Sequence, residues 1–137
     1  LLTPHAGELL RLLGADPSSA RADDRPTLER EAVSLAAAID ATIVLKGPGS
    51  LVVDATGGQS HNDTGNPGMA TAGTGDVLTG VAAAVVAQGL SVRDAARLAT
   101  WVHGRAGDAA AADLGEVSMT AGDLLARLHV AFRDAAC

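Results

Sequence analysis

The chain has 137 residues, enough for one domain, and it carries 16 acidic and 10 basic residues, for a net charge of −6. Nucleic acid selects basic surfaces and aromatic stacking platforms. This charge, with one Trp, one Phe and no Tyr, therefore argues against a nucleic-acid partner. The single cysteine, Cys137, excludes a disulfide framework or a cysteine metal site within one chain and fits a reducing compartment. No signal peptide is visible, so we expect a cytoplasmic protein with no membrane partner.

The first half of the chain alternates short apolar runs with helical patterns. The expected elements, in chain order, are the end of a buried strand at 1–2, a helix at 8–13 closed by Gly14, a polar loop at 15–24, a helix at 26–39, and strands at 42–45, 50–54 and 60–63. The strands at 42–45 and 50–54 are joined by Lys46-Gly47-Pro48-Gly49 and are expected to form a hairpin or an adjacent pair.

The second half is expected to be helical, with helices at 77–87, at 92–113 and at 121–135. Ser91 with Asp94, and Thr120 with Asp123, have the spacing of capping boxes. The last helix is expected to turn Leu124, Leu125, Leu128 and Phe132 inward. The apolar run 77–87 is too short to span a bilayer, which needs about 20 residues. Together the elements predict an α/β layer protein with too few strands to close a large sheet alone.

The most informative stretch is the loop that runs from Asn66 into the helix at 77–87. Gly73, Thr74 and Gly75 leave backbone N–H groups free at the start of that helix, where the helix dipole is positive. The glycines also let an anion approach the main chain closely, so the pattern predicts a phosphate site. Asp76 lies beside that site, and two interpretations stay open: a base for a hydroxyl that reacts with phosphate, or a first-turn charge favoured by the dipole.

Polar loops follow the expected strand ends, and ligands of open α/β sheets bind beyond the C-terminal ends of the strands. The loops are Thr3–Glu8, Lys46–Ser50, Asn62–Asn66 and Gly73–Asp76. We therefore expect the strands that end near Leu2, Lys46 and Asn62 to point toward the Asp76 loop, so that all four loops share one site.

Ordinary roles stay open for the individual side chains of these loops. His5 is also explained as a turn residue, Glu8 as a first-turn helix charge and Lys46 as a solvated strand end. His103 is expected to be structural, and His61 and His129 to lie on the surface. No pair of His residues has metal-ligand spacing on a helix, so zinc is not expected.

Three segments carry a resemblance. They are Thr3–Glu8 (TPHAGE), Val44–Ser50 (VLKGPGS) and Asn62–Gly80 (NDTGNPGMATAGTGDVLTG). In order and spacing they resemble the ADP/ATP-dependent NAD(P)H-hydrate dehydratases of the ribokinase-like superfamily, and the third, long and matched throughout, is the most specific. The resemblance covers essentially the whole chain. It implies that residues 1–137 are the C-terminal half of a single ribokinase-like domain.

The resemblance implies nicotinamide-nucleotide repair. The expected reaction is dehydration of the S epimer of hydrated NADH or NADPH, in which ADP gives AMP and phosphate, or ATP gives ADP if the enzyme is eukaryotic-type. Hydroxide is a poor leaving group, whereas a phosphorylated hydroxyl leaves well with a push from the ring nitrogen. The expected co-substrate is ADP or ATP with Mg²⁺, and a homo-oligomer is expected for the full-length form.

Site residues follow from the same resemblance. Asp76 is expected to be the catalytic base on the substrate hydroxyl, and His5 to contact the hydrated nicotinamide nucleotide. The residues expected to bind the adenine nucleotide are Lys46, Gly47, Pro48, Gly49, Ser50, Gly73, Thr74 and Gly75. Related kinases carry Asn where His5 stands, and their Glu, matched by Glu8, works near magnesium. Glu8 is therefore expected to approach Mg²⁺ through water.

Two alternatives stay open. A vitamin-precursor kinase of the same superfamily often resembles the third segment but carries Cys where Asp76 stands, so Asp76 and the Asn66–Ala70 segment favour the dehydratase. An inactive fragment or interaction module is the other alternative. A half-domain exposes a sheet edge and an apolar layer, so the chain is expected to belong to a longer polypeptide or to pair with another chain.

Overall fold

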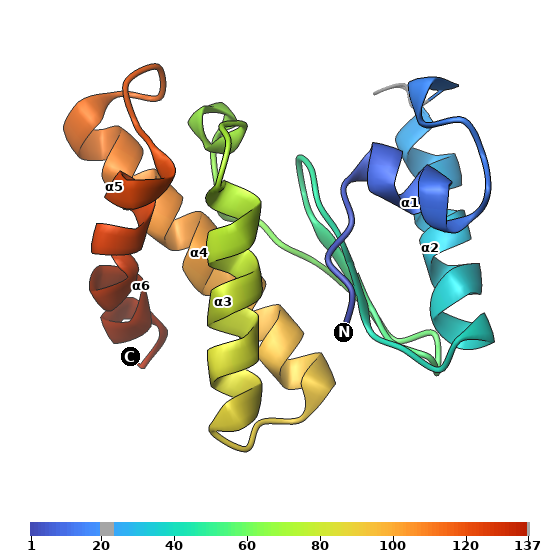
Figure 1. Ribbon diagram of the computed structural model, residues 1–137. Coiled ribbons are helices and arrows are strands. Elements are labelled where there is room, and N and C mark those ends of the chain that lie inside the picture. Colours follow the sequence, from blue (N-terminus) through green and yellow to red (C-terminus); the bar gives the residue numbers. More distant parts are fainter. Residues whose placement is uncertain (20–23, 137) are drawn as a thin grey trace. The chain divides into compact units, whose positions relative to one another are not determined.

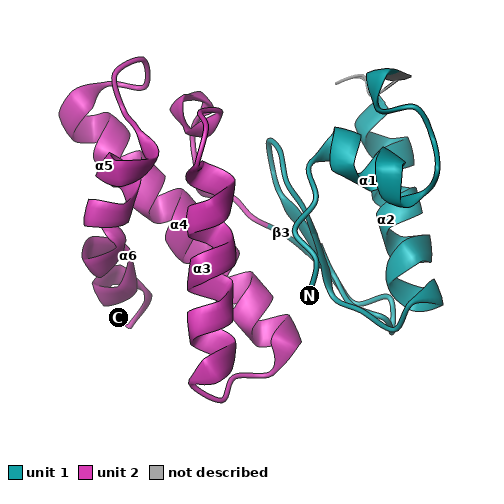
Figure 2. Ribbon diagram, in the orientation of Figure 1, with its two compact units in different colours: residues 1–61 teal, residues 62–137 magenta. Residues whose placement is uncertain are grey.

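The computed structural model describes residues 1–19 and 24–136, which form two compact units, residues 1–61 and residues 62–137 (Figures 1 and 2). Cys137 lies outside the described residues, as do residues 20–23, which belong to the loop expected at 15–24. Within the rest of that loop, residues Pro17–Ser19 form one turn of 3-10 helix. Each unit has its own packed interior and is described separately.

The first unit is a three-stranded sheet packed against two helices (Figure 1). Strands β1 (Ile43–Leu45), β2 (Leu51–Val53) and β3 (Gln59–His61) pair antiparallel in the order β1-β2-β3, with Val52 opposite both Val44 and Ser60. The predicted hairpin and the strands expected at 42–45 and 50–54 are therefore confirmed. The strand expected at 60–63 lies at Gln59–His61, and the strand end expected at 1–2 forms only an isolated parallel bridge from Leu2 to Ile43. Helices α1 (Ala6–Leu12) and α2 (Arg25–Ala38) cover one face. The buried core of this unit comprises Leu9, Leu28, Ala32, Ala36, Ile43, Leu45, Leu51 and Val53.

A carboxylate builds the turn between β2 and β3. One oxygen of the buried Asp54, Oδ1, accepts hydrogen bonds from the Thr56 N–H at 2.8 Å, the Thr56 hydroxyl at 2.6 Å and the Gly58 N–H at 3.0 Å. Gly57 supplies the left-handed backbone of the turn, with φ of +85°. The three donors hold the hairpin closed, so β3 returns alongside β2.

The second unit is helical. Its elements are the 3-10 turn η3 (Pro67–Met69), α3 (Thr74–Ala87), α4 (Val92–Leu114), α5 (Ala121–Ala126) and α6 (Leu128–Ala135). Helix α4 packs against α3, α5 and α6, and its buried face is made mostly of Ala and Gly. Across residues 1–19 and 24–136, no helix combines the length and the apolar character needed to cross a membrane.

The structure corrects the expectation about the last helix. The single helix at 121–135 is wrong, because the backbone breaks at Arg127 and gives α5 and α6. Of its expected inward side chains, Leu124 is buried, but Leu125 and Phe132 are 56% and 38% exposed. Leu125 precedes the break and lies on the exposed side of α5. Beyond the break the original helical phase no longer applies, and Leu128 is half-buried.

Of the two predicted capping boxes, one forms completely and the other only in part. Thr120 and Asp123 form the predicted capping box. At Ser91 only half of it forms: the Asp94 N–H donates to the Ser91 hydroxyl at 3.1 Å, but the Asp94 carboxylate binds that hydroxyl instead of the cap's backbone. Helix α3 begins at Thr74, three residues before the predicted start, so Gly75 and Asp76 lie in its first turn.

Small residues on α4 let the loop before α3 lie directly on the helix. A Cβ built on Gly104 would lie 2.7 Å from the carbonyl carbon and oxygen of Thr64, and one built on Gly107 would meet the side chain of Met69. The Thr64 hydroxyl donates to the Trp101 carbonyl at 2.9 Å. Asp108 accepts from the Gly65 N–H at 2.9 Å and from the Asn66 amide at 3.0 Å. This close docking sets the path of residues 62–70.

Gly104→Ala is expected to lower the free energy of unfolding by about 2–4 kcal/mol, because the added methyl overpacks against Thr64 backbone that cannot yield easily. The matched control is Gly80→Ala on α3, where nothing lies within 4 Å of an added Cβ. There alanine's helix propensity should raise stability by up to about 1 kcal/mol. Urea unfolding followed by circular dichroism measures both; equal effects would contradict the close-docking account.

Candidate functional site

In the first unit the predicted strand-end loops come together. Residues 2–4 run parallel to β1: the Leu2 N–H donates to the Thr42 carbonyl at 3.0 Å, and the Lys46 N–H donates to the Pro4 carbonyl at 2.8 Å. Strands β1 and β3 are each antiparallel to β2 and so run in the same direction. The C-terminal ends of the Leu2 segment, β1 and β3 therefore lie at one edge of the sheet, as predicted for this unit.

His5, Glu8 and Lys46 form a polar cluster at that edge. The Glu8 N–H donates to His5 Nδ1 at 3.2 Å, and the His5 N–H donates to Glu8 Oε2 at 2.7 Å, which makes a capping box at the start of α1. The Lys46 ammonium lies 3.3 Å from Glu8 Oε2. Because His5 Nδ1 accepts, the ring hydrogen resides on Nε2, which faces Glu8 Oε1 at 3.4 Å.

The carboxyl group of Glu8 is held in its charged form. Partial burial raises its pKa, but the His5 N–H and the Lys46 ammonium outweigh that effect, so the pKa of Glu8 lies below its ordinary value of 4.5. Glu8 is thus a helix cap as well as a candidate ligand. A hydrated Mg²⁺ that travels with nucleotide phosphates needs only one or two protein carboxylates, so this exposed group fits such an ion through water.

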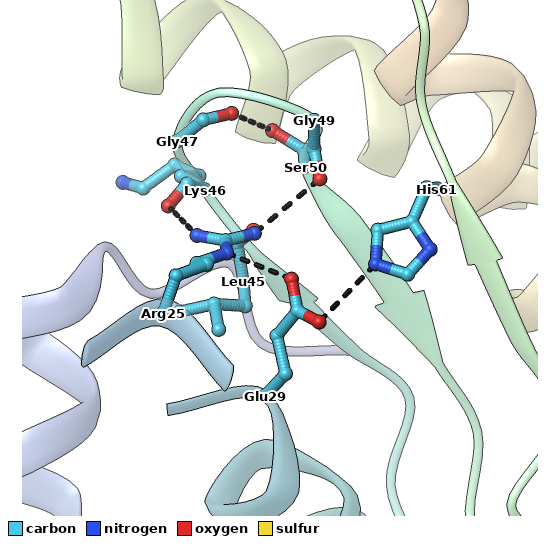
Figure 3. Close-up of polar contacts among 8 residues, drawn as sticks. All are labelled: Arg25, Glu29, Leu45, Lys46, Gly47, Gly49, Ser50 and His61. Atoms are coloured by element: carbon cyan, nitrogen blue, oxygen red, sulfur yellow. Dashed lines mark hydrogen bonds and ion pairs between the residues drawn. The ribbon is translucent and has the colours of Figure 1, made fainter. Parts of the chain in front are cut away.

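The Lys46–Ser50 loop rests on Arg25, the first residue of α2 (Figure 3). Its guanidinium donates to the carbonyls of Lys46 and Leu45 at 3.1 Å each, and to that of Gly49 at 3.4 Å. The Ser50 hydroxyl closes the turn by donating to the Gly47 carbonyl at 3.0 Å. Sequence reasoning missed Arg25. The predicted helix began at residue 26, one residue after Arg25, so the spacing of four between Arg25 and Glu29 was not considered as a helical pair.

In the second unit, the start of α3 has the open geometry that the glycine pattern predicts. Gly73 is the N-cap residue, with φ of +90°, and no side chain caps the helix. The Thr74 hydroxyl donates to the carbonyls of Met69 and Thr71, at 2.8 and 2.9 Å, so it braces the loop and leaves the helix end open. The exposed carboxylate of Asp76 lies in the same first turn.

His103 reaches this turn from α4. Its Nε2 lies 2.8 Å from the Thr74 carbonyl, which can only accept, so Nε2 carries the hydrogen and donates. The imidazole is buried, in agreement with the expected structural role, and it fixes the peptide between Thr74 and Gly75. His61 and His129 are exposed, as expected, although His61 contacts Glu29 at 3.3 Å.

The predicted residues therefore form two sets. One contains His5, Glu8 and the Lys46–Ser50 loop, and the other contains Gly73–Asp76. Each set is brought together within its own unit, and their union in one site stays a prediction. Within the part of the chain that the structure describes, no group of three or more His, Cys, Asp or Glu side chains is arranged to hold a metal ion.

Comparison with solved structures defines the fold class. The chain superposes on a Bacillus subtilis structure of an ADP/ATP-dependent NAD(P)H-hydrate dehydratase, co-crystallised with ATP/Mg²⁺, with a TM-score of 0.86, 26% identity and coverage of 97% of this chain and 47% of that one. An Enterococcus faecalis structure titled as a ribokinase-like superfamily protein matches with a TM-score of 0.69 and 28% identity over 96% of this chain and 44% of that one. The fold is the predicted ribokinase-like α/β fold.

Comparison of sequences defines the family. The NAD(P)H-hydrate dehydratase family model matches residues 1–129, and the chain belongs to that family. A bifunctional NAD(P)H-hydrate repair enzyme of Moorella thermoacetica is 44% identical over 98% of this chain and 24% of its own length. An ADP-dependent (S)-NAD(P)H-hydrate dehydratase of Neisseria meningitidis is 41% identical over 79% of this chain and 35% of its own length. The chain thus spans about a quarter to a third of these relatives.

Acid should weaken the Glu8 cluster. A pKa that is lower in the folded state contributes stability above pH 4.5, and that contribution is lost as the pH falls through the folded value. Glu8→Gln should therefore cost about 0.5 kcal/mol at pH 7, the size of an exposed ion pair, and much less near pH 3. Urea unfolding between pH 3 and pH 7 measures this difference. The control is Glu31→Gln, an exposed change on α2; a pH-independent cost at Glu8 would contradict the account.

Proposed function

We propose that this chain carries the catalytic base and the nucleotide-binding loops of an enzyme that dehydrates hydrated NADH or NADPH, in the S form, at the expense of a nucleotide phosphate. The observation that carries the proposal is the exposed carboxylate of Asp76 in the same first turn as the uncapped N–H groups of α3. Family membership and the names of the relatives support the substrate class.

The proposed chemistry has two steps. The hydroxyl oxygen of the hydrated ring attacks the terminal phosphorus of ADP, the bond to AMP breaks, and Asp76 takes the hydroxyl proton. The C–O bond then breaks and its electron pair leaves with phosphate, while the lone pair of the ring nitrogen forms a double bond. Loss of a proton from the neighbouring ring carbon restores the reduced nicotinamide. The balance is hydrated cofactor plus ADP giving reduced cofactor, AMP and phosphate.

In the proposal, the remaining site residues bind and orient the two substrates. The N–H groups of Gly73, Thr74 and Gly75 stabilise the negative charge on the transferred phosphoryl group, helped by the positive end of the α3 dipole. Lys46–Ser50 lines the adenine-nucleotide site, and His5 contacts the hydrated nicotinamide nucleotide. Glu8 is the residue that would hold Mg²⁺ through water, and the ion would neutralise phosphate charge there.

The proposal also covers the co-substrate, the compartment, the oligomeric state and the union of the two loop sets. ADP is the co-substrate, as in the name of the Neisseria relative, although the Bacillus protein was crystallised with ATP/Mg²⁺. We propose a cytoplasmic homo-oligomer that binds no nucleic acid. Union of the two loop sets in one site is also part of the proposal. The vitamin-precursor kinase is not favoured, since the names of the relatives point to the dehydratase.

Asp76→Asn in the full-length protein is expected to lower turnover of hydrated NADPH by about 10²–10⁴-fold, the usual effect of losing a general base. Asn is isosteric with Asp but cannot take the hydroxyl proton, so nucleotide affinity should hold or rise slightly as charge repulsion falls. Recovery of reduced-cofactor absorbance measures turnover, and calorimetric titration with ADP and ATP measures binding.

The matched control is Asp94→Asn, which removes a first-turn aspartate from α4 and should leave turnover unchanged. Near-wild-type turnover of Asp76→Asn would show that Asp76 is only a first-turn charge. Joint loss of nucleotide binding and activity would make the residue structural. Accumulation of phosphorylated product without elimination by the wild-type protein would favour the kinase.

A further inference from the structure

Arg25 occupies a place that the helix dipole does not explain. It is the first residue of α2, where the helix dipole is positive and a cation is unfavourable. Its side chain is nevertheless only 22% exposed, and it makes four hydrogen bonds within the unit, three of them to carbonyls of the segment 45–49. The position of this arginine is therefore set by the loop that it contacts.

The carbonyl contacts decide where the N–H groups of the loop point. In a trans peptide the N–H of the next residue points away from the carbonyl, and no described peptide is cis. Because Arg25 draws the carbonyls of Lys46 and Gly49 toward α2, the N–H groups of Gly47 and Ser50 point to the opposite side. Among the described residues, no backbone carbonyl accepts a hydrogen bond from either N–H group. They are available to an anion or a nucleotide.

Glu29, which also contacts His61, holds the guanidinium of Arg25 in place (Figure 3). Glu29, one helical turn along α2, accepts from Arg25 Nε at 2.8 Å through Oε1. Its other oxygen lies 3.3 Å from His61 Nε2, at the end of β3. Burial raises the pKa of Glu29, but Arg25 and His61 outweigh it and hold the pKa below the ordinary value. A charged Glu29 thus fixes Arg25 between α2, the loop and the sheet.

We propose that Arg25, held by Glu29, is a positioning residue that presents the Lys46–Ser50 loop to the adenine nucleotide. This inference rests on the proposed function of that loop. The guanidinium acts through the loop backbone and does not touch the reacting atoms. The φ of +142° at Gly47 favours glycine there, and a built Cβ would lie 2.8 Å from Arg25 Nη1, so a larger residue would shift the guanidinium.

Lysine cannot replace this arginine. The planar guanidinium donates in several fixed directions at once, toward three carbonyls and one carboxylate, whereas an ammonium is a single point on a flexible stem. Arg25→Lys keeps the charge and most of the apolar stem. It therefore separates loop positioning from electrostatic attraction of the nucleotide.

The experiment compares Arg25→Lys, Arg25→Ala and Glu29→Ala with Arg30→Ala in the full-length protein. Arg30 lies on the same helix, is exposed and donates only to the Thr27 hydroxyl, at 2.8 Å, among its described contacts. Both Arg25 variants should raise the KM and the calorimetric Kd for ADP by about tenfold, through lost preorganisation. The KM for hydrated NADPH and kcat should change by less than about threefold, and Arg30→Ala should match the wild type.

Three results would overturn the inference. An unchanged Kd for ADP in Arg25→Lys would mean that the loop needs no guanidinium. An equal change in both KM values and in kcat would mean that Arg25 has a general structural role. The same conclusion would follow if ADP binding were lost only in those variants whose circular dichroism shows that they do not fold. Failure of the proposed function is distinguishable: if the wild type binds ADP in an Arg25-dependent way but does not dehydrate the cofactor, the positioning role stands and the dehydratase does not.

Discussion

The open N-terminus of α3 is the constraint on which the candidate site depends. A helix start that is meant for a ligand must keep its N–H groups free of caps, yet the chain before it must still be held. Here the loop is fixed through its carbonyls and side chains. The Thr74 hydroxyl binds two loop carbonyls, and His103 binds the Thr74 carbonyl from α4. The Thr74 N–H donates to the Thr71 carbonyl at 3.5 Å, whereas the N–H groups of Gly73 and Gly75 donate to no backbone carbonyl among the described residues. Free N–H groups at a helix start are what an anion site requires.

The Lys46–Ser50 loop follows the same physical rule in the other unit. Arg25 donates to its carbonyls from α2, and the N–H groups turn outward as a geometric consequence. In both places a long donor side chain on a neighbouring helix orients loop peptides. In the proposed function these N–H groups are donors that are preorganised before a ligand binds, and preorganised donors are a main source of electrostatic stabilisation in phosphoryl transfer.

The composition of the chain makes such close docking possible. With one Trp, one Phe and no Tyr, the interior is built from Leu, Val, Ile and Ala. Helix α4 in particular has a surface of small residues, so the 62–70 loop lies within contact distance of the helix backbone at Gly104. Short side chains bring main chain close to main chain, and hydrogen bonds such as that from the Thr64 hydroxyl to the Trp101 carbonyl then become possible.

Local patterns in the sequence determined much of this protein. Apolar periodicity predicted the strands of the hairpin and the helices α2, α3 and α4, and the glycines at Gly73 and Gly75 predicted an uncapped helix start, because each depends on residues close in the chain. Tertiary structure decided the rest. At Arg127, where the helix breaks, the guanidinium forms an ion pair with Asp113 of α4 at 2.7 Å. Arg25 contacts the Lys46 carbonyl and His103 contacts the carbonyl of Thr74 at the start of α3, and both partners are more than twenty residues away in the chain, at contacts that no local pattern encodes. Hydrogen-bond partners across the fold are chosen by packing, and packing becomes visible only when the elements are assembled.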